Sequence, residues 1–89
     1  MAWQIDWSKA ADRDLGNFGS EEKRRIVNFM ETRVAGLENP RDLGEALKAG
    51  KLGHLWRYRV GDYRVLASIE DELVKILVVA VDHRREVYR

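Results

Sequence analysis

The sequence predicts an α+β domain in which two N-terminal helices pack on one face of a small, mainly antiparallel sheet. Three features indicate this fold: an alternating apolar stretch near the start, apolar residues at helical spacing, and three consecutive strand-like segments after residue 54. The expected order is β-α-α-β-β-β, which gives a four-stranded sheet in a two-layer arrangement. A chain of 89 residues is expected to form one domain, spanning 1–89.

The first half of the chain carries the helix signals. Residues 2–7 alternate apolar and polar side chains, which predicts a short strand. Ser8 is expected to cap a first helix that runs to about Phe18. Ser20 is expected to cap a second, longer helix, which Asn39-Pro40 ends because a residue before proline avoids the helical region. The apolar stripe of this second helix comprises Ile26, Val27, Met30, Val34 and Leu37.

Strand signals dominate the last third of the chain. The segment 41–53 has three glycines and no periodicity, so we expect a turn-rich connector there. The expected strands lie at about 55–60, 63–70 and 73–82. Gly61-Asp62 suits a two-residue hairpin loop between the first two of them. The run Leu73–Val81 is apolar on both faces except at Lys75, which predicts burial on both sides. The pairing partner of the first strand stays open.

The predicted hairpin separates an apolar face from an arginine face. With the loop at Gly61-Asp62, Arg59 lies opposite Arg64, and Arg57 falls on the same side because side chains alternate along a strand. The apolar face consists of Trp56, Tyr58, Val60, Tyr63, Val65, Ala67 and Ile69. Like charges directly across a hairpin are destabilising. We therefore expect an anion to bind over Arg57, Arg59 and Arg64.

The last strand returns toward the hairpin loop and brings further polar residues to that end. If the strand continues without interruption, His83 falls on the arginine face, and Arg84 follows directly. The predicted patch comprises Arg57, Arg59, Arg64, His83 and Arg84. Each member has a simpler interpretation: a lone arginine is usually solubilising, a lone histidine is often a surface residue, and Tyr88 could cover an apolar edge. The clustering of three arginines favours a functional role.

Composition excludes several other classes of site. The net charge is only +1, so the basic character is local, and every lysine or arginine after His54 is an arginine except Lys75. The chain has no cysteine, and its two histidines lack paired spacing, so no metal site is expected. No glycine-rich phosphate loop is present, and no cofactor is expected. Neither a secretion signal nor a membrane-spanning run is visible, which fits a cytoplasmic protein.

Two stretches carry a resemblance to a known family. They are GHLWRYRVGDYRVLASI, at 53–69, and VAVDHRREVYR, at 79–89. Together they resemble the RelE/ParE superfamily of bacterial toxins, and its RelE branch in particular. The resemblance implies a type II toxin that enters the A site of the 70S ribosome and cleaves mRNA by 2′-OH attack on the scissile phosphate. It also implies a RelB-like antitoxin, acidic and partly disordered when free, as a partner, and no membrane.

The same resemblance carries over to Arg57, Arg59, Arg64, Arg84 and Tyr88, and the predicted site adds His83, Lys51 and Arg85. The catalytic set is Arg57, Arg59, Arg64, His83, Arg84 and Tyr88, and the RNA-binding set is Arg57, Arg59, Arg64, Lys51 and Arg85. Arginine stabilises phosphorane-like charge but is a poor base, because it does not lose its proton in proteins. Histidine exchanges protons near neutral pH, so His83 is the candidate acid or base. Which residue moves the proton stays open.

Two other functions fit the same pattern. A ParE-like protein would share the scaffold but poison DNA gyrase without nuclease chemistry. A catalytically inactive relative would use the arginine face only to bind its antitoxin. The arginines together with His83, Arg84 and Tyr88 favour RNA cleavage over both.

Overall fold

The described strands form one five-stranded sheet in the order β1-β5-β4-β3-β2. The computed structural model describes residues 2–47 and 55–83. Its strands are β1 (Gln4–Trp7), β2 (Glu45–Ala46), β3 (Trp56–Val60), β4 (Tyr63–Glu70) and β5 (Lys75–His83). The pair β1–β5 is parallel, and the other pairs are antiparallel. The α+β class is confirmed, and β2 adds one strand to the four expected, because two residues are too few to show alternation.

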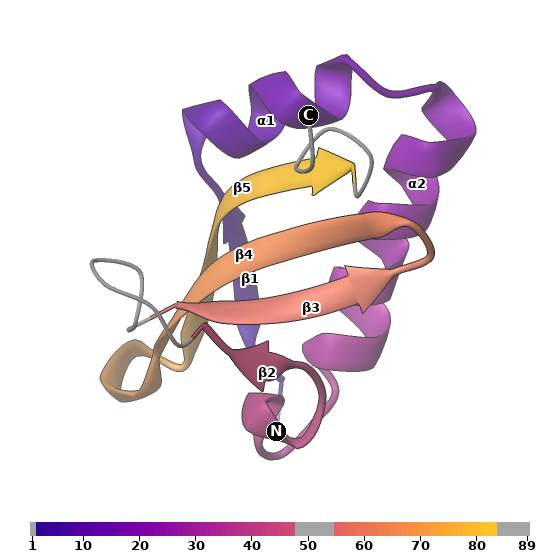
Figure 1. Ribbon diagram of the computed structural model, residues 1–89. Helices are drawn as coiled ribbons and strands as arrows, with labels where there is room; N and C mark the ends of the chain where they lie inside the picture. The colour runs from indigo at the N-terminus through magenta and orange to yellow at the C-terminus, as the bar shows by residue number, and fades with distance from the viewer. Residues whose placement is uncertain (1, 48–54, 84–89) are drawn as a thin grey trace.

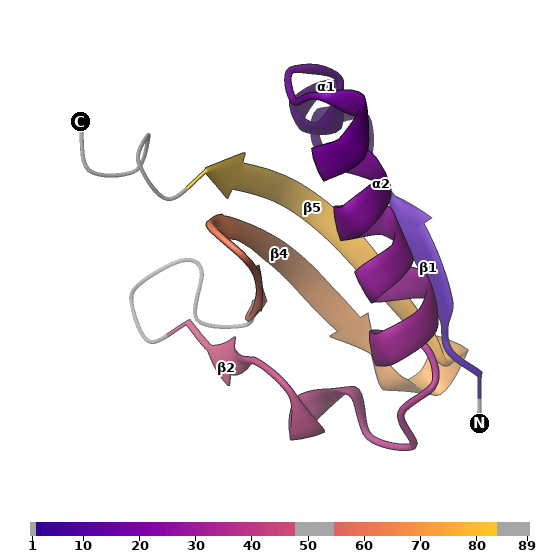
Figure 2. The same ribbon diagram turned by 90° about the vertical axis from the view of Figure 1, so that its right-hand side faces the viewer.

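Two helical segments lie on one face of this sheet (Figures 1 and 2). Helix α1 (Lys9–Gly16) begins after Ser8, whose side chain accepts a hydrogen bond from the Ala11 N–H at 3.0 Å, as expected for a cap. Helix α2 (Ser20–Asn28) continues as the π-helix η1 (Phe29–Val34). The N-cap of α2 is Gly19, so the prediction of Ser20 as the cap is wrong by one residue. None of the described helices is long and apolar enough to cross a membrane.

The core lies between the helices and the sheet. The buried side chains on its helical side include three members of the predicted stripe, together with Ala11 and Leu15 of α1, whereas Val27 and Leu37 of that stripe are only half-buried. On its sheet side they come from the apolar face of the hairpin and from β5. The largest of them are Tyr58, Ile26, Met30, Ile76, Val34, Val65, Val78 and Val81. The opposite face, here called the open face, is turned away from α1 and α2 (Figure 2). Burial on both sides of the last strand is therefore not found: Leu77 and Ala80 are half-buried, and Leu73 is 65% exposed.

A β-bulge interrupts the pairing of β4 with β5. Leu66 lies opposite Ala80 and Ala67 lies opposite Val78, so Val79 is an extra residue on β5. From that point on, the side chains of β5 exchange faces relative to an uninterrupted strand. Val81, which lies opposite Val65, is buried in the core together with Ile76 and Val78. The bulge thus decides which residues at the end of β5 reach the open face.

The start of α1 satisfies the backbone groups that the bulge displaces. β1 pairs with β5 as far as Val78, which answers the open question of its partner. Beyond it, the Ser8 hydroxyl donates to the Val79 carbonyl at 3.1 Å. The Val81 N–H donates to the Asp14 carboxylate at 2.9 Å. Beyond the end of β1, the side chains of Ser8 and Asp14 therefore provide hydrogen-bond partners for the backbone along the edge of β5.

An ion pair connects the segment before β2 to the turn between β4 and β5. The short 3₁₀ helices η2 (Pro40–Asp42) and η4 (Asp71–Leu73) approach each other. Arg41 donates both terminal nitrogens to the two oxygens of Asp71, at 2.9 Å each. The buried Tyr58 hydroxyl donates to the Pro40 carbonyl at 2.6 Å. The hydrogen bond from Arg41 lowers the pKa of Asp71, and burial raises the pKa of Tyr58.

Replacing Asp71 is expected to weaken the acid sensitivity of the fold. Because the pKa of Asp71 is lowered on folding, its contribution to stability is present above the unfolded value of 3.8 and is lost as the pH falls through the folded value. The free energy of unfolding of the wild type should therefore drop more steeply below about pH 4 than that of Asp71→Asn. Urea titrations at several acidic pH values measure this difference, with Glu72→Gln as the neighbouring carboxylate control. Identical acid dependence in wild type and Asp71→Asn would contradict the assignment.

Candidate functional site

The three hairpin arginines share the open face, as predicted. Arg59 lies opposite Arg64, and Arg57 lies opposite Leu66, in the register expected from the Gly61-Asp62 loop. Arg59 is exposed, whereas the side chains of Arg57 and Arg64 are 23% and 12% exposed. These three residues are here called the arginine face. Two of its guanidinium groups are held against the sheet, and the third projects into solvent.

Two carboxylates that the sequence reasoning missed lie beside these arginines. Glu45 of β2 is opposite Arg57 in the register and forms an ion pair with its guanidinium group. Asp82 of β5 is opposite Arg64, with its Oδ1 atom 3.4 Å from Arg64 Nε. Within the described part of the chain, Arg59 has no carboxylate partner. The arginine face is therefore flanked by one carboxylate on each side, Glu45 beside Arg57 and Asp82 beside Arg64.

The placement of His83 differs from the prediction. It lies opposite Tyr63, on the face covered by the helices, and not on the arginine face. Its ring meets the Tyr63 ring edge-on, with centroids 4.9 Å apart, and Tyr63 also packs on Phe18 at 4.6 Å. The bulge at Val79 causes this, because one extra residue exchanges His83 and Asp82 between the faces. His83 still lies at the hairpin end of the sheet, but its side chain is half-buried among aromatic rings.

Several predicted site residues lie outside the described residues. They are Lys51, Arg84, Arg85 and Tyr88. Among the residues that the structure does describe, no group of three His, Cys, Asp or Glu side chains is arranged to hold a metal ion.

A groove runs from the arginine face along the outer edge of β3. β2 pairs only with Trp56 and Arg57, and past this point the groove separates β3 from the π-helix. Its volume is about 400 Å³. Its lining comprises Phe29, Arg33, Leu43, Gly44, Glu45, Arg57, Tyr58 and Arg59. The Arg33 guanidinium carbon lies 5.9 Å from the centre of the Phe29 ring.

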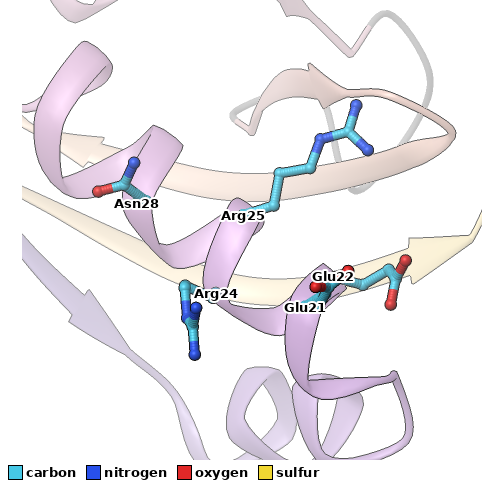
Figure 3. Close-up of a pocket in the computed structure, with 5 residues that line it drawn as sticks. All are labelled: Glu21, Glu22, Arg24, Arg25 and Asn28. Atoms are coloured by element: carbon cyan, nitrogen blue, oxygen red, sulfur yellow. The ribbon is translucent and has the colours of Figure 1, made fainter.

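A second hollow extends this positive surface toward the hairpin loop. Its lining includes Arg25, Arg33, Arg59 and Gly61. Arg25 reaches the loop closely enough that a Cβ added to Gly61 would lie 2.6 Å from its Nη2 atom. Figure 3 shows Arg25 extending away from α2, with its guanidinium group near Gly61 of the hairpin loop, while Glu21 and Glu22 lie at the start of the helix. The shallow hollow in Figure 3 is lined by α2 alone, with both signs of charge, whereas the β3 groove combines residues of several elements.

Comparison with known proteins shows the family to which the chain belongs. The model of the ParE toxin of the type II toxin–antitoxin system parDE matches residues 5–88 of the chain. The chain belongs to the RelE/ParE toxin superfamily. This RelE/ParE toxin is 28% identical to the toxin RelG of Mycobacterium tuberculosis over 89 residues, which cover 100% of the chain and 99% of RelG.

Solved structures show the same fold. The toxin–antitoxin complex RelBE2 of Mycobacterium tuberculosis contains a chain that superposes with a TM-score of 0.85 at 26% identity, covering 94% of this toxin and 93% of that chain. The archaeal RelE–RelB complex of Pyrococcus horikoshii OT3 gives a TM-score of 0.71 at 24% identity, covering 94% and 97%. The toxin described here is thus a member of a superfamily whose structures include complexes with antitoxins.

Gly44 is expected to be essential for placing Glu45 beside Arg57. Its φ is +78°, and a Cβ there would lie 2.7 Å from Trp56 Nε1 and closer still to the Arg57 carbonyl oxygen. Gly44→Ala should therefore lower the free energy of unfolding by at least about 1–2 kcal/mol, the cost of a left-handed backbone alone. Urea denaturation measures this effect.

Gly16→Ala is the matched control, because a Cβ at Gly16 meets no atom within 4 Å. Since alanine is a better helix former than glycine, this variant should be neutral or more stable by up to about 1 kcal/mol. Equal stabilities for the two variants would contradict the close approach of β2 to β3 at Gly44.

Proposed function

We propose that this toxin is a metal-independent mRNA endoribonuclease that acts in the ribosomal A site and thereby inhibits translation. The observation that carries the proposal is the arginine face: three guanidinium groups on two neighbouring strands, on the side of the sheet turned away from the helices. Such an arrangement suits a phosphate in which negative charge develops during reaction. The resemblance to RelE-type toxins supports the ribosome, mRNA and the bacterial cytoplasm as the setting.

The proposed reaction is attack of a 2′-OH on the adjacent phosphate. It forms a 2′,3′-cyclic phosphate and releases the 5′-oxygen of the next nucleotide. Arg57, Arg59 and Arg64 clamp the phosphate and stabilise its transition-state charge, since preformed donors in a fixed position need no reorganisation. Asp82 holds Arg64 in place through its contact with Nε. Arg84 and Tyr88 are proposed to act at the leaving group and on a stacked base.

RNA binding is proposed to extend beyond the scissile phosphate. Lys51 and Arg85 are proposed contacts with the RNA backbone, together with the arginine face. The groove beside β3 adds Arg33, and the second hollow adds Arg25, so cationic groups follow the edge of the sheet over two adjoining hollows. A basic groove of this kind is suited to tracking phosphates without reading the base sequence.

The proposed regulator is an acidic, RelB-like antitoxin. Two related structures are complexes of a RelE-type toxin with its RelB antitoxin. Carboxylates of such a partner would compete with RNA for Arg59, which is exposed and has no carboxylate partner within the described residues. The antitoxin would then suppress activity by occupying the arginine face or by covering the groove.

A gyrase poison is the alternative function, because the matching family model describes ParE toxins. Fold does not separate the two functions, since the superfamily shares one scaffold. The arginine face favours phosphate chemistry, whereas a poison requires only a surface that binds gyrase.

The decisive experiment adds purified toxin to 70S ribosomes programmed with a defined mRNA and maps the ends by primer extension. The expected result is cleavage in the A site that requires ribosomes. Arg59→Gln and Arg64→Gln should each slow cleavage by about 10²-fold or more, because each removes a charged donor from the transition state. Arg13→Gln removes one positive charge from the exposed surface of α1 and should leave the rate unchanged.

A parallel assay tests the alternative. Gyrase and supercoiled DNA are incubated with the toxin, and trapped gyrase–DNA complexes are measured. Trapped complexes without any ribosome-dependent cut would overturn the nuclease proposal. Cleavage by both arginine variants at the wild-type rate would overturn the assignment of the site.

A further inference from the structure

We propose that the Phe29 ring is a stacking platform for one unpaired base of the mRNA, a role that rests on the nuclease function proposed above. In this role the base of a nucleotide beside the scissile phosphate lies against Phe29, and Arg33 covers the outer side of the base. The inference starts from the two hollows at the edge of β3, which share Phe29, Arg33 and Arg59 in their linings.

Phe29 lies between two cations on one stripe of the helix. Arg25, Phe29 and Arg33 follow one another at intervals of four residues, so they lie on the same side of the helix, and all three line the second hollow. The neighbouring stripe, with Met30 and Val34, is buried in the core. Phe29 itself is only half-buried and packs against the edge of that core. Part of its ring is therefore open to the groove, between two guanidinium groups.

The ring lies where the second helix changes from α-helix to π-helix. η1 begins at Phe29, and the Ala35 N–H donates to the Met30 carbonyl, five residues earlier, at 2.9 Å. The Thr32 hydroxyl donates to the Asn28 carbonyl at 2.6 Å and so satisfies an acceptor at the start of the widened turn. π-Helical turns are rare and occur frequently at functional sites. The irregular geometry of this helix is thus confined to the segment that borders the two hollows.

The β3 groove offers a base both apolar contact and positive charge. Leu43 adds an apolar side chain to the lining, and Arg59 adds an exposed guanidinium group. Tyr58 also borders the groove, but it is fully buried, so Phe29 supplies the accessible ring. Proteins that bind single-stranded RNA combine a basic groove with aromatic rings on which the bases stack. The lining of this groove has both components.

Arg59 connects the platform to the scissile phosphate. It belongs to the arginine face and also lines both hollows. β2 pairs only with Trp56 and Arg57, so the edge of β3 is open beyond that point, toward Arg59. A nucleotide whose phosphate is bound by Arg59 would therefore place its base in the groove beside Phe29. Stacking would fix the attached ribose relative to the arginines, and such orientation is what in-line attack of the 2′-OH requires.

Arg33 supplies the second side of the stack. Its guanidinium carbon lies 5.9 Å from the centre of the Phe29 ring, so a cation covers the ring while the groove is empty. Arg33 is exposed, and a base that enters would take its place on the ring. The planar guanidinium group then stacks on the outer side of the base. Because every base has a flat π-face, this contact accepts any base.

The test measures toxin binding to 70S ribosomes programmed with an mRNA whose 2′-OH groups around the A-site codon are replaced by hydrogen, so that no cut can occur. One base at a time is removed from this codon and its neighbours, and the affinity is determined by co-sedimentation with the ribosomes. For the wild type, removal of one particular base should weaken binding by about 5- to 100-fold, the usual contribution of a base stacked on an aromatic ring. Phe29→Leu should bind the intact mRNA more weakly, and removal of the same base should cause no further loss.

Two further variants serve as controls. Phe29→Tyr keeps the ring and should retain the wild-type response to removal of the base. Phe18→Leu is the matched control, because Phe18 is another half-buried phenylalanine that packs on Tyr63 at 4.6 Å and lines neither hollow. It should respond as the wild type does. Each variant is compared with itself on intact and abasic mRNA, so a general loss of stability would not imitate the predicted pattern.

Two outcomes would overturn the platform while leaving the nuclease proposal standing. Phe29→Leu could respond to the removal of every base as the wild type does, which would mean that Phe29 serves only the core. The weaker binding of Phe29→Leu could persist in full on ribosomes whose mRNA ends before the A-site codon, which would assign the stacked base to ribosomal RNA. Conversely, the predicted response to base removal, without any cut of all-ribose mRNA by the wild type, would overturn the nuclease proposal alone.

Discussion

The candidate site depends on a single extra residue, Val79, in the strand that both α1 and β1 accompany. The bulge exchanges the faces of everything after it, so Val81 enters the core, Asp82 reaches Arg64, and His83 meets Tyr63. A bulge leaves backbone groups without ladder partners, and a buried unpaired group costs about 1–3 kcal/mol. Here the side chains of the first helix accept or donate those bonds, at the Val79 carbonyl and the Val81 N–H. Ser8 and helix α1, which lies on the other face of the sheet, therefore stabilise the bulge on which the arrangement of the site depends.

The consequence is a surface on which three arginines of the hairpin are flanked by a carboxylate of β2 on one side and a carboxylate of β5 on the other. The opposed Arg59 and Arg64 repel each other, and Asp82 of β5 offsets this repulsion beside Arg64, while Glu45 of β2 pairs with the neighbouring Arg57. The same carboxylates prevent the face from being a uniform polycation, consistent with a net charge of only +1. Arg59, exposed in the middle of this arrangement, is the group on which RNA and an acidic antitoxin are proposed to compete. The ion pairs of Arg57 with Glu45 and of Arg64 with Asp82 therefore offset the repulsion between the arginines and also reduce the positive charge that an anion meets.

Much of this arrangement could be predicted from the sequence, because strong local signals specify it. Gly61-Asp62 sets the register of the hairpin, and with it the shared face of Arg57, Arg59 and Arg64. The bulge has no such signal, since β5 is apolar on both faces and a shift of one residue leaves its pattern unchanged. β2 is too short to show alternation, so Glu45 looked like one acid in a glycine-containing connector. Both missed carboxylates belong to contacts between segments distant in sequence, which a local pattern cannot reveal.

The register of β5 tests the account most directly, and nuclear Overhauser contacts in the free, isotope-labelled toxin measure it. The account predicts cross-strand backbone contacts of Leu66 with Ala80 and of Ala67 with Val78, and ring contacts between His83 and Tyr63. An uninterrupted strand would instead pair Leu66 with Val79 and Arg64 with Val81. That second pattern would return His83 to the arginine face, remove Asp82 from Arg64, and contradict the charge arrangement on which the site rests.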